Sequence, residues 1–149
     1  MKLSLIVPCY NEAENVAEFQ AAVISAFDRC GYDYEIVFVD DGSKDATLHN
    51  LRKLHAKQEC PVKVISFSRN FGKESGLYAG LQHASGEYIS LVDADLQQRP
   101  EIVREMVEIL DTNPETDVVA AYQDRRSEGK VLAFFKKSFY AIKIGRSHV

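Results

Sequence analysis

The stretch IVFVDDGSKD, residues 36–45, sets four apolar residues directly before a turn that is rich in acids. A short apolar run with β-branched side chains predicts a buried strand over 36–39. Residues 47–58 follow with leucines three positions apart, which predicts a helix. The stretch therefore predicts a strand that leads through an acidic loop into a helix.

The same alternation extends along the chain in both directions. Further strands are predicted over 3–7, 62–67, 88–92 and 118–121, and further helices over 14–30, 73–84 and 100–111. Asn11 or Asn15 can cap the first of these helices, Gly31 sits where it is expected to end, and Pro100 opens the last. Such alternation predicts an α/β fold: a Rossmann-like, doubly wound and mostly parallel sheet with helices on both faces.

Composition limits the kinds of protein that this chain can be. Its 149 residues are 46% hydrophobic and 27% charged, which is typical of one folded domain. It contains no apolar run of about 18 residues, so no membrane span is predicted. Three widely spaced cysteines with no Cys-x-x-Cys pair predict neither a disulfide framework nor a zinc site, but reduced thiols in the cytosol.

The charge is unevenly distributed. Residues 1–124 hold 11 Lys and Arg against 21 Asp and Glu, a balance of −10, whereas residues 125–149 have a balance of +6. An acidic body is a poor nucleic-acid binder, because such binding depends on neutralising phosphates. With no linker before residue 122, we expect a domain over 1–124 and a separate basic segment over 125–149.

Acidic residues follow three of the predicted strands. They lie in residues 8–12, in residues 40–45 and at Asp93-Ala94-Asp95. Parallel strands meet at their carboxyl ends, so we expect these loops to share one edge of the sheet. Crowding like charges is costly without a counter-ion, and this edge should therefore hold a cation, a ligand with hydrogen-bond donors, or both.

Patterns that are missing narrow the choice of ligand. The chain has neither the Gly-x-Gly-x-x-Gly of dinucleotide folds nor a P-loop, so a diphosphate bound here would need a divalent metal for neutralisation. Asp93 and Asp95, two positions apart in an extended loop, offer oxygen ligands suited to Mg²⁺ or Mn²⁺. Each pattern also has an ordinary explanation: Asp-x-Asp can be a solvated turn, and Asp45 or Ser43 can simply cap the next helix.

Four motifs together resemble those of the family 2 glycosyltransferases with the GT-A fold. The similarity is greatest to the group of dolichyl-phosphate mannose synthase and bactoprenol glucosyltransferase, and it covers residues 3 to about 121. The motifs are IVPCYNE at 6–12, VDDGSKD at 39–45, FSRNFGKE at 67–74 and DADLQ at 93–97. The Ser-Arg-Asn-Phe-Gly-Lys element points to the branch that uses polyprenyl phosphates.

This resemblance implies an inverting transferase that moves a sugar from a UDP- or GDP-sugar to a polyprenyl phosphate. A growing saccharide as acceptor, or a binding module without turnover, remains an alternative. On the nucleotide side, the resemblance implies a pocket of Pro8, Tyr10 and Glu12, and contact of Asp40 with the base, with Asp41 beside it. On the sugar diphosphate side, it implies that Asp93 and Asp95 are catalytic residues and metal ligands, with Asp95 the more direct ligand, and that Ala94 and Gln97 lie near the donor. It also implies phosphate contact by Arg69 and Lys73. The last two could instead be surface charges at the start of a helix.

The chain departs from the family pattern in three respects. An Arg often follows the fifth strand in the family, whereas Arg125 and Arg126 come a few residues later here. Residues 98–101 read Gln-Arg-Pro-Glu, which changes a charge near the expected site. Relatives also continue into a segment that supplies the presumed base, an Asp. We therefore expect the chain to be incomplete and the base to lie outside it.

The basic segment has an amphipathic pattern over 130–144. On a helix, one arc would carry Val131, Leu132, Phe134, Phe135, Phe139 and Ile142, bordered by lysines. This favours an interfacial helix on an anionic membrane, or a helix that covers the sheet edge or another part of the protein. The resemblance favours the membrane, and implies a location at the cytoplasmic face of the cell membrane. An exposed apolar arc also predicts self-association.

Overall fold

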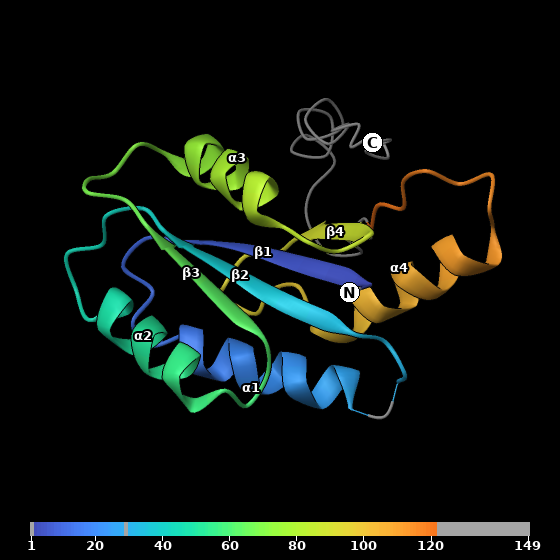
Figure 1. Cartoon of the computed structure of the whole chain (residues 1–149), viewed down its shortest axis with the longest axis horizontal. Helices are drawn as coiled ribbons and strands as arrows, with labels where there is room; N and C mark the ends of the chain where they lie inside the picture. The colour runs from blue at the N-terminus through green and yellow to red at the C-terminus, as the bar shows by residue number, and fades with distance from the viewer. Residues whose placement is uncertain (1, 29, 122–149) are drawn as a thin grey trace, which may run out of the picture. The chain divides into compact units, whose positions relative to one another are not determined.

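The computed structural model describes residues 2–28 and 30–121. Their contacts divide the chain into two compact units, Met1–Arg104 and Glu105–Val149. Strands and helices alternate throughout (Figure 1). In order, the elements are β1 (Leu3–Cys9), α1 (Val16–Phe27), β2 (Tyr34–Asp40), α2 (Thr47–Lys57), β3 (Val62–Ser66), α3 (Lys73–His83), β4 (Tyr88–Leu91) and α4 (Pro100–Thr112).

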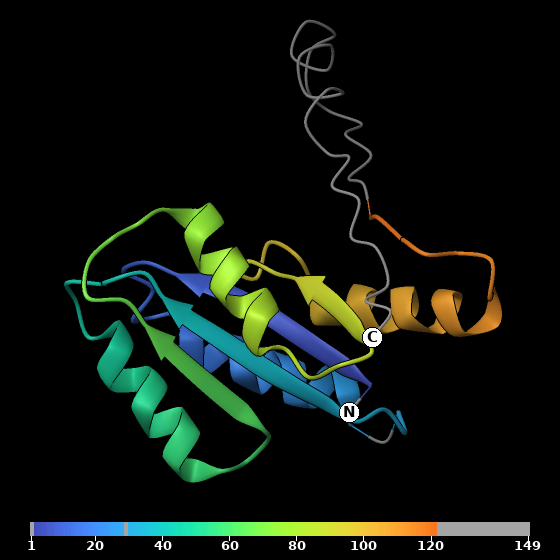
Figure 2. The same cartoon turned by 45° about the horizontal axis from the view of Figure 1, so that its top comes forward.

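The four strands form one parallel sheet in the order β3-β2-β1-β4. The chain steps outward from β1 to β3 and then returns, so that β4 pairs with the free side of β1 (Figure 2). Helix α3 covers one face of the sheet, and α1 and α2 cover the other (Figure 1). The predicted doubly wound α/β fold with helices on both faces is confirmed.

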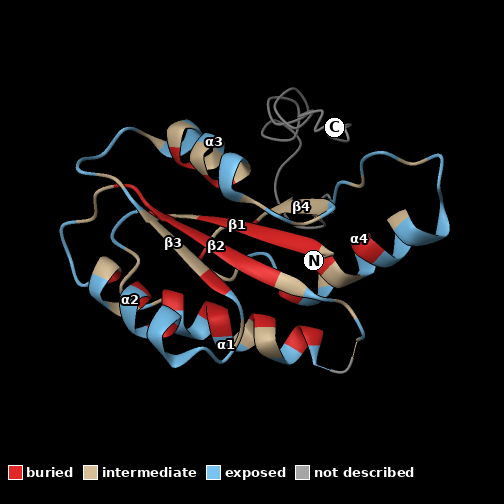
Figure 3. Ribbon diagram, in the orientation of Figure 1, coloured by how far each residue is buried: buried red, intermediate tan, exposed pale blue. Residues whose placement is uncertain are grey.

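The core lies on both faces of the two central strands, which are almost entirely buried (Figure 3). Ile6, Val37 and Val39 form a cluster against apolar side chains that include Leu77 of α3. On the other face, the ring of Phe38 meets that of Phe19 edge-on at 6.0 Å between centroids. Strands that are covered by helices on both faces of the sheet have continuous apolar sequences, which explains why the strand over 36–39 could be predicted.

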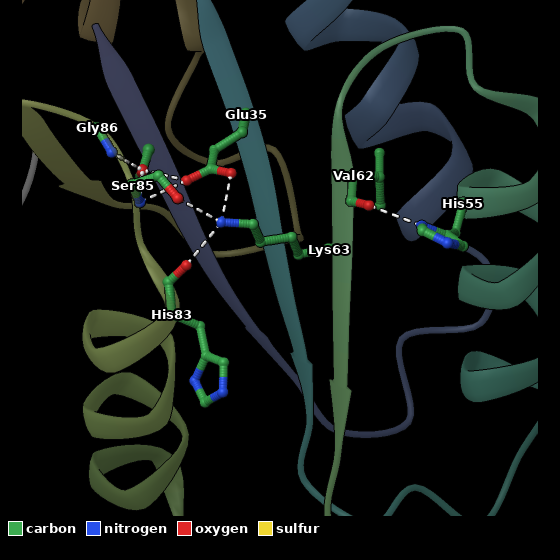
Figure 4. Close-up of polar contacts among 8 residues, drawn as sticks. Glu35, His55, Val62, Lys63, His83, Ser85 and Gly86 are labelled. Carbon is green, nitrogen blue, oxygen red and sulfur yellow. Dashed lines mark hydrogen bonds and ion pairs between the residues drawn. The ribbon is translucent and has the colours of Figure 1, made fainter. Parts of the chain in front are cut away.

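A polar cluster fastens the amino ends of the strands (Figure 4). Glu35 is 3% exposed, and its Oε1 accepts hydrogen bonds from Ser4 Oγ and the Ser85 amide, each at 2.7 Å. Its Oε2 lies 2.9 Å from Lys63 Nζ, which also donates to Ser85 Oγ at 2.6 Å. This cluster ties β1, β2 and β3 to the loop after α3. On the same strand as Lys63, the Val62 carbonyl lies 2.7 Å from His55 Nδ1.

Some sequence expectations were wrong. Residues 118–121 form no strand, and Val118 is 45% exposed. A β-strand is stable only when its backbone pairs with another strand, and a short apolar run in the sequence does not show that a partner strand is present. Helix α1 is also shorter than the predicted 14–30 at both ends. It begins later because residues 12–15 form a turn in which the Glu12 carbonyl accepts from the Asn15 and Val16 amides, and it ends at Phe27 rather than near Gly31. The side chains predicted to cap it do not: Asn15 makes no cap hydrogen bond, and Asn11 Oδ1 accepts from the Lys44 amide instead.

Several expectations concern residues outside the described ranges. They are the helix over 130–144, the boundary near residue 124, and the roles of Arg125 and Arg126. These stay predictions. Among the residues that are described, no helix combines the length and the apolar character needed to cross a bilayer.

Candidate active site

The strand order puts the candidate site at the carboxyl ends of β1 and its two neighbours. β2 and β4 pair with opposite sides of β1, and both pairings are parallel. Asp40 is the last residue of β2, opposite Cys9, and Asp93 follows β4 at the same edge. In doubly wound sheets, such a reversal of strand order forms the crevice that binds ligands. The predicted gathering of acidic loops at one edge is confirmed.

Negative charges surround the end of β1, where Cys9 is 1% exposed. Burial first, and then the charges of Glu12, Asp40 and Asp93, raise the pKa of the Cys9 thiol far above its ordinary value. Carboxylates at or just beyond the carboxyl ends of three different strands therefore act on one buried sulfur. Such a thiol stays protonated, so Cys9 is a packing residue and not a nucleophile.

The loop after β1 carries three of the predicted nucleotide contacts. Pro8 is half-buried within the strand, whereas Tyr10 is 42% exposed. Glu12 is also half-buried, and its Oε2 accepts a hydrogen bond from Asn15 Nδ2 at 2.6 Å. Tyr10 therefore has the most surface for a ligand, while Glu12 also stabilises the turn into α1.

Asn11 joins the first two loops, a role that the sequence did not indicate. Its backbone N–H donates to Ser43 Oγ at 2.9 Å, and its side-chain Oδ1 accepts from the backbone N–H of Lys44 at 2.9 Å. Its φ of 57° lies in the left-handed region, which Asn tolerates better than most residues. An Asn two residues beyond the end of a strand was the available signal, but only its partner 32 residues along the chain identifies the role.

Asp45 is not the predicted N-cap of α2, because Ala46 occupies that position, but its carboxylate accepts hydrogen bonds just before the helix. Its Oδ1 accepts from the Thr47 amide at 2.9 Å and from Thr47 Oγ1 at 2.5 Å. Its Oδ2 accepts from the Ala13 amide at 3.2 Å. The Thr47 side chain is the main cause of a lowered Asp45 pKa. Asp45 thus holds the start of α2 against the loop after β1, whereas Ser43 does not cap that helix.

Asp40 and Asp41 are both buried, at 1% and 4% exposure. Asp40 accepts from the Ser43 amide at 3.2 Å and from Ser66 Oγ at 3.1 Å. Asp41 accepts from two backbone amides of the loop before α3. These carboxylates therefore connect the loop after β2 to β3 and to the residues that follow it.

The loop before α3 brings positive charge to this edge. Lys73 Nζ lies 2.6 Å from Asp93 Oδ1, which joins the start of α3 to the loop after β4. The Arg69 guanidinium lies 4.3 Å from the centroid of the Phe71 ring. Both side chains of the Lys73–Asp93 pair are about half exposed, at 57% and 43%, so the contact fits either a ligand site or a surface ion pair at the start of a helix.

The Asp-x-Asp motif presents two accessible carboxylates and a buried alanine between them. Asp93 is half-exposed, Asp95 is exposed, and Ala94 is 3% exposed. Asp95 Oδ1 accepts from the Gln97 amide at 3.1 Å. In the described part of the chain, no three His, Cys, Asp or Glu side chains are grouped as metal ligands. Two carboxylates with open positions still fit Mg²⁺ or Mn²⁺, which commonly take their remaining ligands from water and substrate phosphates.

With this arrangement, the chain can be compared with known proteins. The sequence profile described as Glycosyl transferase family 2 matches residues 4–144. The chain belongs to glycosyl transferase family 2. The bactoprenol glucosyl transferase of Shigella phage SfV is 39% identical over 142 residues, which are 95% of this chain and 46% of the phage protein. The prophage bactoprenol glucosyl transferase homolog of Escherichia coli (strain K12) gives the same figures. The family-2 chain spans less than half of the length of these relatives.

Solved structures show the fold of this family-2 chain to be GT-A. The mannosyltransferase PcManGT from Pyrobaculum calidifontis, in complex with GDP-Man and Mn²⁺, matches with a TM-score of 0.68 and 28% identity, over 78% of this chain and 34% of that one. TarS 1–349 from S. aureus, in complex with UDP, matches with a TM-score of 0.63 and 30% identity, over 75% of this chain and 32% of that one.

Proposed function

We propose that this chain binds the nucleotide diphosphate sugar of an enzyme that transfers the sugar to an acceptor. The observation that carries the proposal is the contact of Lys73 Nζ with Asp93 Oδ1, at 2.6 Å. It joins the start of α3, where Lys73 follows a loop that carries Arg69, to the loop that holds Asp93 and Asp95. A metal-bound sugar diphosphate needs both kinds of group, cations for its phosphates and carboxylates for the metal.

The nucleotide would lie toward the loop after β1. Tyr10 supports this, because it is an aromatic residue that is 42% exposed at the edge where the acidic loops meet. Pro8 and Glu12 are proposed to line the same pocket, and Gln97 and Ala94 the sugar side. Asp40 is also proposed at the base. Because it is 1% exposed and its two oxygens accept from Ser43 and Ser66, contact with the base would have to replace one of these hydrogen bonds.

Asp95 and Asp93 would hold the divalent metal, Mg²⁺ or Mn²⁺. The exposure of Asp95 supports it as the more direct ligand, and the complex of PcManGT with GDP-Man and Mn²⁺ supports the class of ion. When bound, the metal would act as a Lewis acid on the departing diphosphate. Arg69 and Lys73 would bind phosphate oxygens and balance the charge that develops there. Lys73 would have to exchange its contact with Asp93 for one with the donor.

A polyprenyl phosphate is the proposed acceptor, and the transfer is proposed to invert the anomeric centre. The acceptor is supported by the names of the Shigella phage and Escherichia coli relatives, both bactoprenol glucosyl transferases or homologs. The whole protein would then work at the cytoplasmic face of the cell membrane, where its lipid acceptor lies. Transfer to a growing saccharide, or binding without turnover, would be distinguished by supplying each acceptor class with radiolabelled donor.

Titration calorimetry with UDP and with GDP, each with and without Mn²⁺, tests the donor site directly. We expect one nucleotide to bind more tightly than the other, and both to require the metal. Heat-denatured chain serves as the control for nonspecific association. If neither nucleotide binds in the presence of Mn²⁺, the proposed function is wrong.

A further inference from the structure

The Asp41 carboxylate is buried against the loop that precedes α3. Its Oδ1 accepts a hydrogen bond from the Phe71 amide at 2.7 Å, and its Oδ2 accepts from the Gly72 amide at 2.9 Å. Asp41 is only 4% exposed, so very little of it is accessible to a ligand. Hydrogen bonds from N–H groups to an ionised carboxylate are about twice as strong as neutral ones. Both oxygens of a buried charge are therefore used to hold two consecutive amides.

Gly42, the next residue, lies very close to the backbone of the same loop. A Cβ at this position would lie 2.4 Å from the Arg69 carbonyl carbon and 2.7 Å from the Asn70 amide nitrogen. The φ of Gly42 is also +64°, a conformation that favours glycine. Two adjacent residues after β2 thus determine where the backbone of residues 69–72 runs.

We propose that Asp41 is a positioning residue, which fixes the backbone of residues 69–73 so that Arg69 and Lys73 face the donor diphosphate. Both cationic side chains start from backbone that Asp41 and Gly42 hold. The inference rests on the proposed function, because it requires a donor at this edge. It gives Asp41 a role that differs from direct contact with the nucleotide.

The effect of an Asp41 substitution on donor affinity depends on how often the loop of residues 69–72 adopts its ordered conformation. In Asp41→Asn, a neutral amide replaces the carboxylate, and its NH₂ group cannot accept from either backbone amide. Losing one charge-assisted hydrogen bond lowers the equilibrium constant between the ordered and the open loop by roughly 10-fold or more, and the ordered fraction falls with it. The apparent affinity for the donor falls in proportion to the fraction that is competent to bind.

A double-mutant cycle on the 149-residue chain separates positioning from contact. The variants are Asp41→Asn, Arg69→Ala and the double variant, and the probes are UDP and GDP with Mn²⁺ in titration calorimetry. We expect each single variant to bind roughly 10-fold more weakly, and the double variant to bind no more weakly than the worse single one. Independent losses that multiply in the double variant would mean that Asp41 contacts the nucleotide itself. Wild-type affinity in either single variant would also overturn the proposal.

Glu35→Gln is the matched control, because Glu35 is another buried carboxylate that accepts from a backbone amide, at the opposite sheet edge. It should lower stability while leaving nucleotide affinity unchanged. Hydrogen exchange at Phe71 and Gly72 should be roughly 10-fold faster in Asp41→Asn and unchanged in Glu35→Gln. Unchanged exchange at both amides in Asp41→Asn would contradict the positioning role.

These measurements also separate the failure of this proposal from that of the proposed function. If the wild-type chain binds neither nucleotide, the donor site is wrong, yet the exchange data still show whether Asp41 holds the loop. If Asp41→Asn does not fold, Gly42→Ala displaces the same backbone with Asp41 intact. We then expect roughly 10-fold weaker binding in Gly42→Ala. Wild-type affinity in Gly42→Ala would contradict the proposal.

Discussion

At the scale of the residue, aspartates of the same edge differ in what surrounds them. Asp41 is buried and accepts from two backbone amides, so it acts within the protein. Asp45 is exposed but still accepts from Thr47 and Ala13. Asp95 is exposed and accepts from one amide, which leaves oxygen lone pairs for a ligand. Accessibility and occupied lone pairs, rather than residue type, separate the structural aspartates from the candidate metal ligand.

This difference predicts opposite results for two alanine variants. Asp95→Ala should abolish nucleotide binding that depends on Mn²⁺ while leaving the free energy of unfolding within about 0.5 kcal/mol of wild type. Asp45→Ala should retain that binding and lose about 1 kcal/mol of stability, because the start of α2 loses its acceptor. Calorimetry and urea unfolding of both variants check this. Equal nucleotide affinity with and without Mn²⁺ in the wild-type chain would remove Asp95 from the metal site.

At the scale of the element, helix α3 packs closely against the sheet at Gly80, and the loop after it is hydrogen-bonded to the sheet. A Cβ at Gly80 would lie 2.3 Å from Ile6 Cγ2, so only glycine allows this approach of helix to strand. At the end of α3, the Glu35 and Lys63 cluster binds the following loop. The position of α3 determines where Lys73, its first residue, meets Asp93. Packing far from the site therefore sets the geometry of the site.

Gly80→Ala should destabilise the chain in spite of the better helix propensity of alanine. The gain in propensity is about 1 kcal/mol, but overpacking against Ile6 costs typically 1–3 kcal/mol. Ile6→Ala alone should cost about 2–5 kcal/mol as a core truncation. The double variant should be more stable than the sum of the two losses predicts, because removing the Ile6 side chain relieves the clash. Strict additivity in urea unfolding would show that α3 can move away freely.

The Glu35 cluster predicts a loss of stability in acid. Burial acts to raise the Glu35 pKa, but hydrogen bonds from Lys63, Ser4 and the Ser85 amide, with the Lys63 charge, outweigh it and hold the pKa below its ordinary value of 4.5. A group with a depressed folded-state pKa contributes stability that is complete above the unfolded value and disappears as the pH falls through the folded pKa. The free energy of unfolding should therefore fall below about pH 4.5.

Glu35→Gln isolates this contribution, because glutamine does not titrate. The difference in stability between wild type and Glu35→Gln should be constant near neutral pH and shrink as the pH falls below 4.5. Denaturant unfolding at a series of pH values measures it. A difference that stays constant down to pH 2 would mean that the pKa of Glu35 is the same in the folded and unfolded chain.

At the scale of the whole molecule, charge separates the chain along its sequence. Residues 1–124 have a balance of −10 and residues 125–149 of +6. Since net charge governs association with charged surfaces rather than fold, the two regions should respond differently to an anionic membrane. The proposed lipid acceptor gives this asymmetry a use, because it would bring the chain to such a surface.

Binding to vesicles tests the basic segment. We expect the chain to sediment with vesicles that contain phosphatidylserine at low salt and to be released near 1 M salt, where the screening length falls to about 3 Å. A chain that ends at residue 124 should remain in solution under both conditions, and vesicles of phosphatidylcholine alone should bind neither. Equal binding to neutral and anionic vesicles would contradict an electrostatic role for residues 125–149.

Much of the fold could be predicted because its signals are local. The apolar run at 36–39 and the leucine spacing of α2 record burial on a strand and a helix, and β2 and α2 begin and end within a few residues of the predicted limits. The run at 118–121 failed because pairing is not local. The sheet edge that gathers the acids was also predictable, since parallel strands in alternation with helices must end on one side.

The sequence by itself thus determined the doubly wound α/β architecture, the family resemblance and the three acidic loops at one sheet edge. Only the tertiary structure decided what each acid does: that Asp41 holds amides 30 and 31 residues away, and that Asp93 meets Lys73 across 20 residues. The physical reason is that a residue's type and its near neighbours fix its backbone preference and charge. Its burial and its hydrogen-bond partners depend on which distant loop packs against it, and no periodicity along the chain encodes that contact.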